Sequence, residues 1–291
     1  MNHIIKNNSL SVTIASLGGE LQSIRDGEDT EYLWQGDPTY WRSRATNIFP
    51  YIGRLTKETY TLDGTAYHMG IHGFAKISEM GAESEKPQHI CFSLRDNAET
   101  RAIYPYSFFY RIHYSLDNNT LHIAYEVENK DSKTMYFGIG GHPGFNVPIE
   151  PNLNFTDYYL VFEGNCKPTQ VGMTAACFVS GNDKPFHLTG ENCLFLDHCL
   201  FDNDAIILKD MAKSVSLRSK KAKKFITVSY PQMDYLGLWH KPHTEAPYLC
   251  IEPWASLPAR QDIIEDLATQ PDLVSLEPGK TYRNEWDITI S

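Results

Sequence analysis

The chain has 291 residues, of which 42% are hydrophobic, 12% aromatic and 21% charged, and its formal net charge is -10. This is the composition of a globular protein rather than a disordered or fibrous one, and the negative charge would repel a phosphate backbone, so we expect no nucleic-acid partner. No charged segment followed by an apolar one opens the chain, and no run of about 18 apolar residues occurs. We therefore expect neither a signal peptide nor a membrane span, and a cytoplasmic location.

Alternation of apolar and polar residues, typical of strands in antiparallel sheets, is the dominant pattern along the chain. In chain order, the apolar positions that alternate are Val12 and Ile14; Tyr110, Ile112, Tyr114 and Leu116; Leu121, Ile123, Tyr125 and Val127; Ile226 and Val228; Tyr282, Trp286, Ile288 and Ile290. Turn sequences stand at 62–65, 116–120 and 277–281. A helix is predicted only over 259–270. Many strands with almost no helix predict a β-sandwich or a related large antiparallel fold, and the lack of a linker favours one domain over residues 1–291.

Three groups of residues look like sites, but for each a role without function is the better interpretation. The lysine-rich run 220–224 lies between two strand-like segments, so we expect a solvated hairpin turn. The six cysteines form no CxxC pair, and we expect reduced thiols that are mostly buried. His240, His243 and Glu245 could bind a metal, but Pro242 between the histidines breaks any helix, so we expect a surface loop and no metal site.

The segment GIGGHPGFNVP (138–148) combines four glycines, two prolines and one histidine. A phosphate-binding loop needs glycines at a defined spacing before a helix. This segment lacks that spacing, and Pro143 and Pro148 argue against a helix. We expect instead a loop after a strand, in which small residues let another group approach the backbone and the His-Pro link holds His142. The local sequence leaves open whether His142 is structural, exposed or part of a site.

Two further segments place polar residues beside apolar ones. His72 in GIHGFAK (70–76) again stands directly before a glycine, and Arg54 lies near the end of the apolar run NIFPYIGRL (47–55). Because a buried arginine is costly without hydrogen bonds, Arg54 either reaches solvent or serves a polar site.

Glu252 lies in YLCIEPWAS (248–256), at the end of an apolar segment and beside an aromatic residue. Burial there would raise the pKa of its carboxyl group, which suits a general base that works near neutral pH. A glutamate at a strand end that faces water is the alternative, and the local sequence does not decide between them.

Taken in order, NIFPYIGRL, HGFA, GGHPGFNVP and CIEPW resemble the aldose 1-epimerase (galactose mutarotase-like) family, and more narrowly its LacX-like branch. The resemblance runs from the first strand to the last. It implies an all-β fold, a large antiparallel β-supersandwich with few short helices, in agreement with the strand pattern. It also implies Glu252 as the general base and His142 as the general acid, with His72 and Arg54 in the shell that binds the sugar.

The resemblance further implies contacts to the sugar itself. An aspartate of the family holds a sugar hydroxyl; Asp204 in NDAIIL is the first candidate here, and Asp197 and Asp234 are alternatives. HGFAK is similar to the HGFAR motif of hexose-6-phosphate mutarotases, so Lys76 would face a phosphorylated sugar. The aromatic residues that could stack on the sugar are Phe74, Phe145, Trp239 and Trp254.

The implied activity is that of a mutarotase, which interconverts the α and β anomers of a hexose or hexose phosphate. The ring opens when the C1 hydroxyl loses a proton and the ring oxygen gains one, for which a carboxylate and an imidazole on opposite sides of the bond suffice. No cofactor is therefore expected. The alternatives are a non-catalytic sugar-binding or regulatory protein of the same fold, and a glycosidase that uses two carboxylates such as Glu252 and Asp204. The expected partner is a small-molecule sugar, and the sequence leaves monomer and homodimer open.

Overall fold

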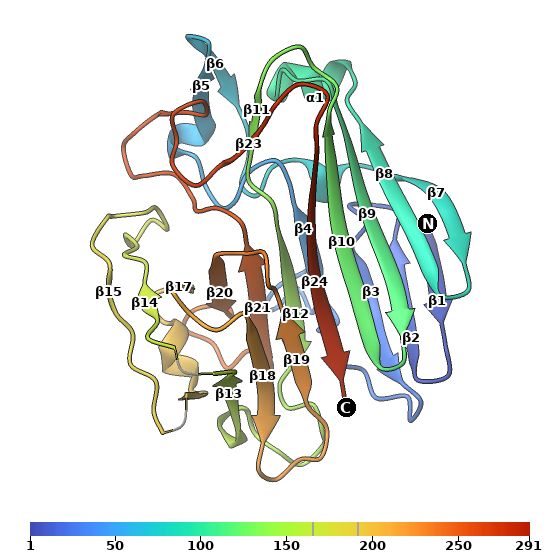
Figure 1. Cartoon of the computed structure of the whole chain (residues 1–291). Coiled ribbons are helices and arrows are strands. Elements are labelled where there is room, and N and C mark those ends of the chain that lie inside the picture. The colour runs from blue at the N-terminus through green and yellow to red at the C-terminus, as the bar shows by residue number, and fades with distance from the viewer. Residues whose placement is uncertain (165, 191) are drawn as a thin grey trace.

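A computed structural model describes residues 1–164, 166–190 and 192–291. Its framework is a pair of large antiparallel sheets (Figure 1). In spatial order, the nine-stranded sheet contains β16 (Cys193–Phe195), β13 (Tyr158–Phe162), β18 (Ser214–Ser219), β19 (Ile226–Ser229), β24 (Thr281–Ile290), β10 (Thr120–Asn129), β9 (Phe108–Asp117), β8 (His89–Arg95) and β7 (Gly81–Lys86). The seven-stranded sheet contains β15 (Lys184–Pro185), β14 (Thr169–Gln170), β17 (Ile206–Lys209), β20 (Tyr235–Trp239), β21 (Tyr248–Trp254), β12 (Gly140–Asn146) and β4 (Ala45–Ile48).

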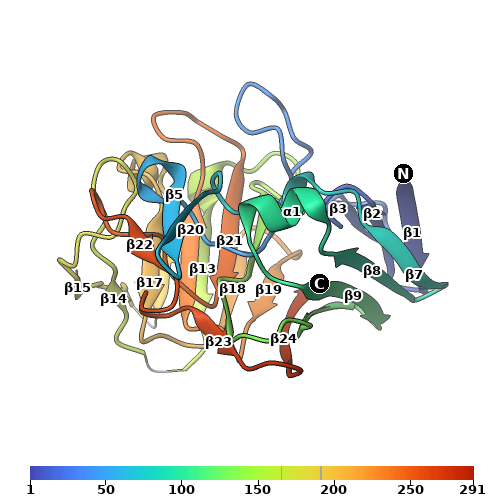
Figure 2. The same cartoon turned by 90° about the horizontal axis from the view of Figure 1, so that it is seen from above.

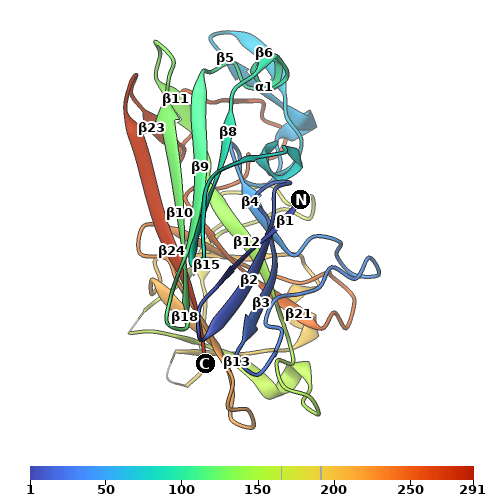
Figure 3. The same ribbon diagram turned by 90° about the vertical axis from the view of Figure 1, so that its right-hand side faces the viewer.

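Smaller elements cover the ends of the two large sheets. The small sheets are β1 (Asn2–Lys6), β2 (Leu10–Ala15) and β3 (Leu21–Asp26); β11 (Met135–Phe137) and β23 (Val274–Leu276); and β22 (Glu265–Asp266), β5 (Thr59–Leu62) and β6 (Thr65–His68). The helices are α1 (Ala98–Ile103) and the 3-10 turns η1 (Thr56–Glu58), η2 (Ala75–Ile77), η3 (Phe155–Asp157) and η4 (His198–Phe201). Figure 2 shows that β1 and β15 lie at opposite ends of the molecule, and the sheet of β1, β2 and β3 faces the viewer in Figure 3. Among the described residues no helix is both long and apolar enough to cross a membrane.

The core lies between the two large sheets. From β21, Leu249 and Ile251 point into one apolar cluster that also contains Trp286 of β24. The strand alternation explains this arrangement, because every second side chain of a strand faces the same side. The predicted all-β class is confirmed, and the alternating segments of the sequence coincide with β2, β9, β10, β19 and β24. That residues 1–291 form a single domain stays a prediction.

The predicted turns are confirmed, but the lysine-rich turn is less exposed to solvent than predicted. Residues 62–65 connect β5 to β6, residues 116–120 connect β9 to β10, and 277–281 lead into β24. The lysine-rich run forms the turn between β18 and β19. Lys224, however, is largely buried there and contacts Asp26 at 2.5 Å.

The helix predicted over 259–270 is wrong. This segment contains turns and the two-residue strand β22, which pairs in parallel with β5. The buried carboxylate of Glu265 accepts hydrogen bonds from Arg260 Nε at 2.9 Å and Nη2 at 2.8 Å, and Asp262 has a φ of 62°. Tertiary pairing has therefore overridden a helix-like pattern of apolar residues. The helix that does form, α1, begins at a capping box between Asn97 and Thr100.

Candidate active site

Two strands bring the predicted acid and base together. In the antiparallel pair of β12 and β21, Gly140 lies opposite Trp254 and Gly144 opposite Cys250. This register leaves His142 facing Glu252 across the strands, and His142 Nε2 lies 3.2 Å from Glu252 Oε2. The predicted loop around His142 is therefore wrong, because the histidine stands within a strand. Glu252 is 2% exposed, which excludes the glutamate that faces water.

The glycines of β12 make room for aromatic rings on both faces of the sheet. A Cβ atom on Gly141 would come within 2.6 Å of the Trp286 ring, on the core side. A Cβ on Gly140 would come within 2.7 Å of the Trp254 ring, on the side of His142. The prediction that small residues permit a close approach is confirmed, and the group that approaches is an indole on each face.

A cavity of about 290 Å³ opens over this face of the sheet. Seven residues that the sequence proposed for the site line it: Arg54, His72, Lys76, His142, Asp204, Trp239 and Glu252. These residues come from strands β12, β20 and β21, from the loops after β4 and β6, from the 3-10 turn η2 and from the loop before β17. A volume of this order suits a small ligand of monosaccharide size.

His72 is held by its backbone and by a hydrogen bond. Its φ is 63°, in the left-handed region, and the N–H of Gly53 donates to its Nδ1 at 3.1 Å. Since Nδ1 accepts, the proton of the neutral ring lies on Nε2. Burial lowers the pKa of His72 well below its ordinary value, and the neighbouring His142, Lys76 and Arg54 add to this shift. His72 is thus a neutral imidazole with one N–H to donate.

Two cationic side chains, Lys76 and Arg54, line the cavity. Lys76 is half-buried, and burial lowers its pKa. Among the described residues no acid lies within ion-pair distance of its ammonium group. The side chain of Arg54 is exposed where it lines the cavity, so it reaches solvent as well as the site.

Of the three candidate aspartates, Asp204 lines the cavity. Its Oδ1 accepts from the backbone N–H of Ala205 at 2.7 Å, and its Oδ2 accepts from Cys177 Sγ at 3.3 Å. Asp197 instead caps η4 through the N–H of Cys199. Asp234 is exposed and forms an ion pair with a lysine. Of the three carboxylates, Asp204 is therefore the one placed to reach a ligand in the cavity.

The aromatic wall of the cavity was predicted only in part. Trp239 and Trp254 line the cavity, whereas Phe74 and Phe145 belong to the core. Sequence reasoning missed Trp41, whose ring stacks on His142 with centroids 4.8 Å apart and an interplanar angle of 25°. Trp41 lies in an irregular segment with no periodicity, so no local pattern distinguishes it from the other tryptophans.

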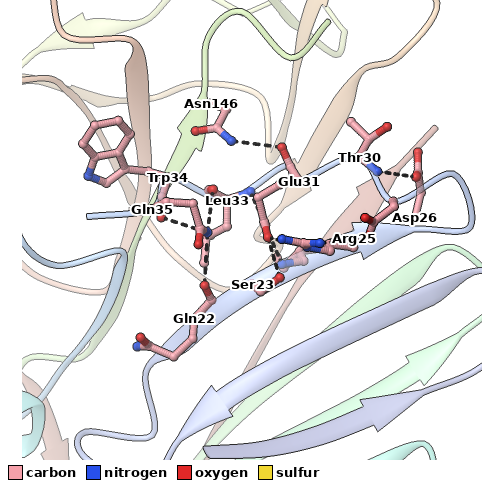
Figure 4. A network of polar contacts seen from close by, with 12 residues as sticks. Gln22, Ser23, Arg25, Asp26, Thr30, Glu31, Leu33, Trp34, Gln35 and Asn146 are labelled. Atoms are coloured by element: carbon pink, nitrogen blue, oxygen red, sulfur yellow. Dashed lines mark hydrogen bonds and ion pairs between the residues drawn. The ribbon is translucent and has the colours of Figure 1, made fainter. Parts of the chain in front are cut away.

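A polar network at the end of β12 holds the segment that leads to this wall (Figure 4). The carboxylate of Glu31 accepts from Ser23 Oγ at 2.5 Å, and its carbonyl accepts from Asn146 Nδ2 at 2.9 Å. The next residues run along β12, where the N–H of Trp34 donates to the carbonyl of Gly144 at 2.9 Å. Trp34 Nε1 then donates to the carbonyl of Trp41 at 2.8 Å. The network thereby fixes the backbone that carries the indole stacked on His142.

The buried acid and base favour their uncharged forms. Burial lowers the pKa of His142 to about 3, and the charge of Lys76 acts in the same direction. Burial, with the charge of Asp204, raises the pKa of Glu252 well above its ordinary value. At neutral pH the pair therefore retains one acidic proton, which either a carboxyl or an imidazolium group can carry.

One cluster offers metal-ligating atoms. His142, Cys250 and Glu252 place a nitrogen, a sulfur and an oxygen within 4.8 Å of one another. Burial raises the pKa of both the Cys250 thiol and the Glu252 carboxyl, so a metal would have to displace two protons. His240 and His243, the other suspected metal ligands, do not come together. His243 is exposed, whereas His240 is buried and its Nε2 lies 3.1 Å from His198 Nδ1. The surface loop predicted for His240 is wrong.

Comparison with known proteins gives concordant results. Residues 2–289 match the family described as aldose 1-epimerase. The chromosomal protein LacX of Lactococcus lactis subsp. lactis is 33% identical over 98% of this chain and 98% of its own. A galactose mutarotase related enzyme from Lactobacillus acidophilus superposes with a TM-score of 0.94 at 34% identity, covering 100% of this chain and 97% of that one. A galactose mutarotase-like protein from Lactobacillus casei gives 0.95 at 29% identity, with both chains fully covered. The predicted galactose mutarotase-like fold is confirmed.

Proposed function

The chain belongs to the aldose 1-epimerase family, and from this premise we propose that it is a mutarotase that interconverts the α and β anomers of a hexose or hexose phosphate. The observation that carries the proposal is the contact between His142 and Glu252, two buried groups of opposite acid–base character that line one cavity. A pair of this kind suits general acid–base chemistry, which needs a donor and an acceptor within hydrogen-bond reach of the substrate.

In the proposed reaction Glu252 takes the proton of the C1 hydroxyl while His142 gives a proton to the ring oxygen. The bond between C1 and the ring oxygen breaks, and an open-chain aldehyde forms. Rotation about C1–C2 and closure with the roles reversed yield the other anomer. Both reacting oxygens are bonded to C1, so two groups that lie side by side, rather than on opposite sides of the bond, suffice to reach them. Ring opening leaves a neutral imidazole and a protonated carboxyl, which are the forms that burial favours.

The remaining residues of the cavity bind the sugar in this proposal. His72 donates from Nε2, Asp204 accepts from a hydroxyl group, and Arg54 donates at the open side. Trp239 offers an apolar face to the carbons of the ring. These roles match the positions of the four side chains around the cavity.

Replacement of the acid or the base tests the proposed activity. We expect Glu252→Gln or His142→Ala to lower the anomerisation rate at least about 10²-fold, because each removes a positioned proton carrier. Polarimetry on freshly dissolved α-anomers measures the rate above the spontaneous one. Asp234→Asn and His243→Ala are matched controls, since both side chains are exposed and lie outside the cavity. A near-normal rate in either cavity variant would contradict the assigned role.

The two alternative functions give different results in the same assays. A non-catalytic sugar-binding protein would bind sugars saturably in calorimetry without accelerating mutarotation. A glycosidase would release a reducing sugar from an aryl glycoside, with both Glu252 and Asp204 required.

Lys76 supports the finer proposal that the substrate carries a phosphate. An ammonium group without an acidic partner can form charge-assisted hydrogen bonds to a phosphate. We expect Lys76→Ala to weaken binding of glucose 6-phosphate about tenfold and to leave binding of glucose nearly unchanged, as measured by isothermal titration. Lys220→Ala, in the exposed turn between β18 and β19, is the control. Equal binding of the two sugars with no effect of Lys76→Ala would exclude a phosphate site at this position.

A further inference from the structure

A short hairpin over residues 173–179 forms one wall of the cavity, and Cys177 stands in it with an unusual backbone conformation. Met173 pairs with Val179, and the N–H of Cys177 donates to the carbonyl of Thr174 at 3.0 Å. The φ of Cys177 is 65°, in the left-handed region, where the Cβ of an L-residue comes close to the following carbonyl oxygen. A residue other than glycine in that region is an outlier that often accompanies a functional role.

The same conformation recurs at other residues of the cavity. His72 and Asp204 have φ values of 63° and 71°, so three non-glycine residues that line the cavity are held in the left-handed region. His72 and Asp204 are proposed sugar ligands. Cys177, which no sequence pattern singled out, shares the conformation and lines the same cavity.

The thiol of Cys177 contacts the carboxylate of Asp204. Sγ donates to Oδ2 at 3.3 Å, while Oδ1 accepts from the backbone N–H of Ala205 at 2.7 Å. Two donors thus act on the two oxygens, which fixes the rotation of the carboxylate. Each oxygen retains a further lone pair with which to accept a hydrogen bond from a sugar hydroxyl.

The thiol remains a donor at neutral pH. Burial and then the charge of Asp204 raise the pKa of Cys177 to about 11, although the nearby Arg54 guanidinium acts in the opposite direction. The thiol therefore keeps its proton beside the carboxylate oxygen that accepts it.

We infer that Cys177 is a positioning residue, whose thiol holds the Asp204 carboxylate in the orientation that accepts a hydroxyl group of the sugar. This inference rests on the proposed function, because it needs a sugar in the cavity. In this inference Cys177 does not contact the reacting atoms. Removal of the thiol should therefore weaken sugar binding and leave the proton transfers unchanged.

Three substitutions separate the thiol from the backbone. Cys177→Ala removes the donor and keeps the backbone strain, Cys177→Gly removes the donor and relieves the strain, and Cys177→Ser keeps a donor. We expect Ala and Gly to raise KM about fivefold, as for loss of one weak hydrogen bond, with kcat changed less than about twofold. Ser should recover most of the lost affinity. Cys199→Ala, exposed and outside the cavity, is the control.

Deoxy sugars supply a readout that a merely structural role would not move. For the wild-type protein, removal of the hydroxyl that Asp204 accepts should raise KM, and in Cys177→Ala that penalty should shrink. An unchanged KM in Cys177→Ala, a Ser variant no better than Ala, or an equal penalty in both proteins would overturn the inference.

A measurement without any sugar distinguishes failure of this inference from failure of the proposed function. If Asp204 accepts from the thiol, Asp204→Asn should lower the pKa of Cys177 and speed its alkylation by iodoacetamide severalfold, as followed by peptide mass spectrometry. An unchanged rate would overturn the inference whatever the enzyme's activity. A faster rate in a protein without mutarotase activity would support the contact and reject the proposed function; the KM readouts are then replaced by sugar binding followed through tryptophan fluorescence.

Discussion

His142 and Glu252 illustrate how a pair of buried groups behaves as one unit. Burial makes a charge costly on either group, and because His142 Nε2 and Glu252 Oε2 lie 3.2 Å apart, the titrations of the two groups are coupled. The local sequence did not decide whether each residue belongs to a site or has only a structural or solvent-exposed role. Both side chains are buried beneath the cavity, and this burial decides in favour of a site. It depends on contacts between distant segments of the chain.

The pair predicts an unusual pH profile. A second proton must go to His142, whose pKa burial lowers to about 3, so kcat/KM should stay level from neutral pH down to about pH 5. On the alkaline side the pair loses its proton only above the raised pKa of Glu252, and the rate should fall there. Polarimetry with the buffer-catalysed rate subtracted measures this profile. An acid limb between about pH 6 and pH 7 would mean that His142 titrates near its ordinary value.

The sequence predicted a site residue where that residue belongs to a recognisable motif. It did not predict residues that reach the site only through contacts between distant segments. Four of the predicted cavity residues lie in the motifs that carry the resemblance, whereas Lys76, Asp204 and Trp239 lie outside those motifs and were further candidates. Trp41 and Cys177 were missed because an indole in an irregular segment and a cysteine in a short hairpin carry no distinctive pattern. Their positions depend on which strand each segment packs against.

At the scale of elements, β12 shows why glycine-rich segments are easily misread. Glycines and prolines suggested a loop, yet Gly140, Gly141 and Gly144 lie in a strand that indole rings cover on both faces. The prediction of a helix over 259–270 was wrong for the opposite reason. The segment has a helix-like pattern, but the ion pair of Arg260 and Glu265 and the pairing of β22 with β5 hold it in a non-helical conformation. Patterns within one segment do not report the partners of that segment.

Close packing on β12 predicts a measurable loss of stability. Gly141→Ala would drive a Cβ into the Trp286 ring, and we expect it to lower the free energy of unfolding by about 1–3 kcal/mol. Urea denaturation measures this change. Gly81→Ala on the edge strand β7 is the matched control, because its Cβ would meet only ordinary contacts. Equal effects of the two substitutions would refute the packing argument.

At the scale of the whole molecule, β24 joins the two halves of the nine-stranded sheet. It lies between β19 and β10, and Trp286, Ile288 and Ile290 are buried. The sequence predicted a final strand and the all-β class from alternation alone. It did not predict the order of strands, because pairing between distant segments leaves no local signal.

Removal of residues 281–291 should therefore abolish folding rather than trim an end. Loss of β24 would expose the edges of β19 and β10 and leave the core open beneath Gly141. We expect insoluble protein or loss of the cooperative thermal transition in circular dichroism. Removal of residues 1–6, which takes away the edge strand β1, should be tolerated better. A cooperative transition that survives the C-terminal truncation would contradict the role given to β24.

The register between β12 and β21 has a consequence for how such a protein diversifies. The proposed acid and base are spaced by the backbone ladder of a central sheet, whereas Arg54, Lys76, Cys177 and Asp204 lie in loops or short turns around it. Under the proposed function, changes in these loops would alter which sugar binds while the distance between the two proton carriers stays the same. Reactivity and recognition would then rest on separate parts of the chain, and one could change without the other.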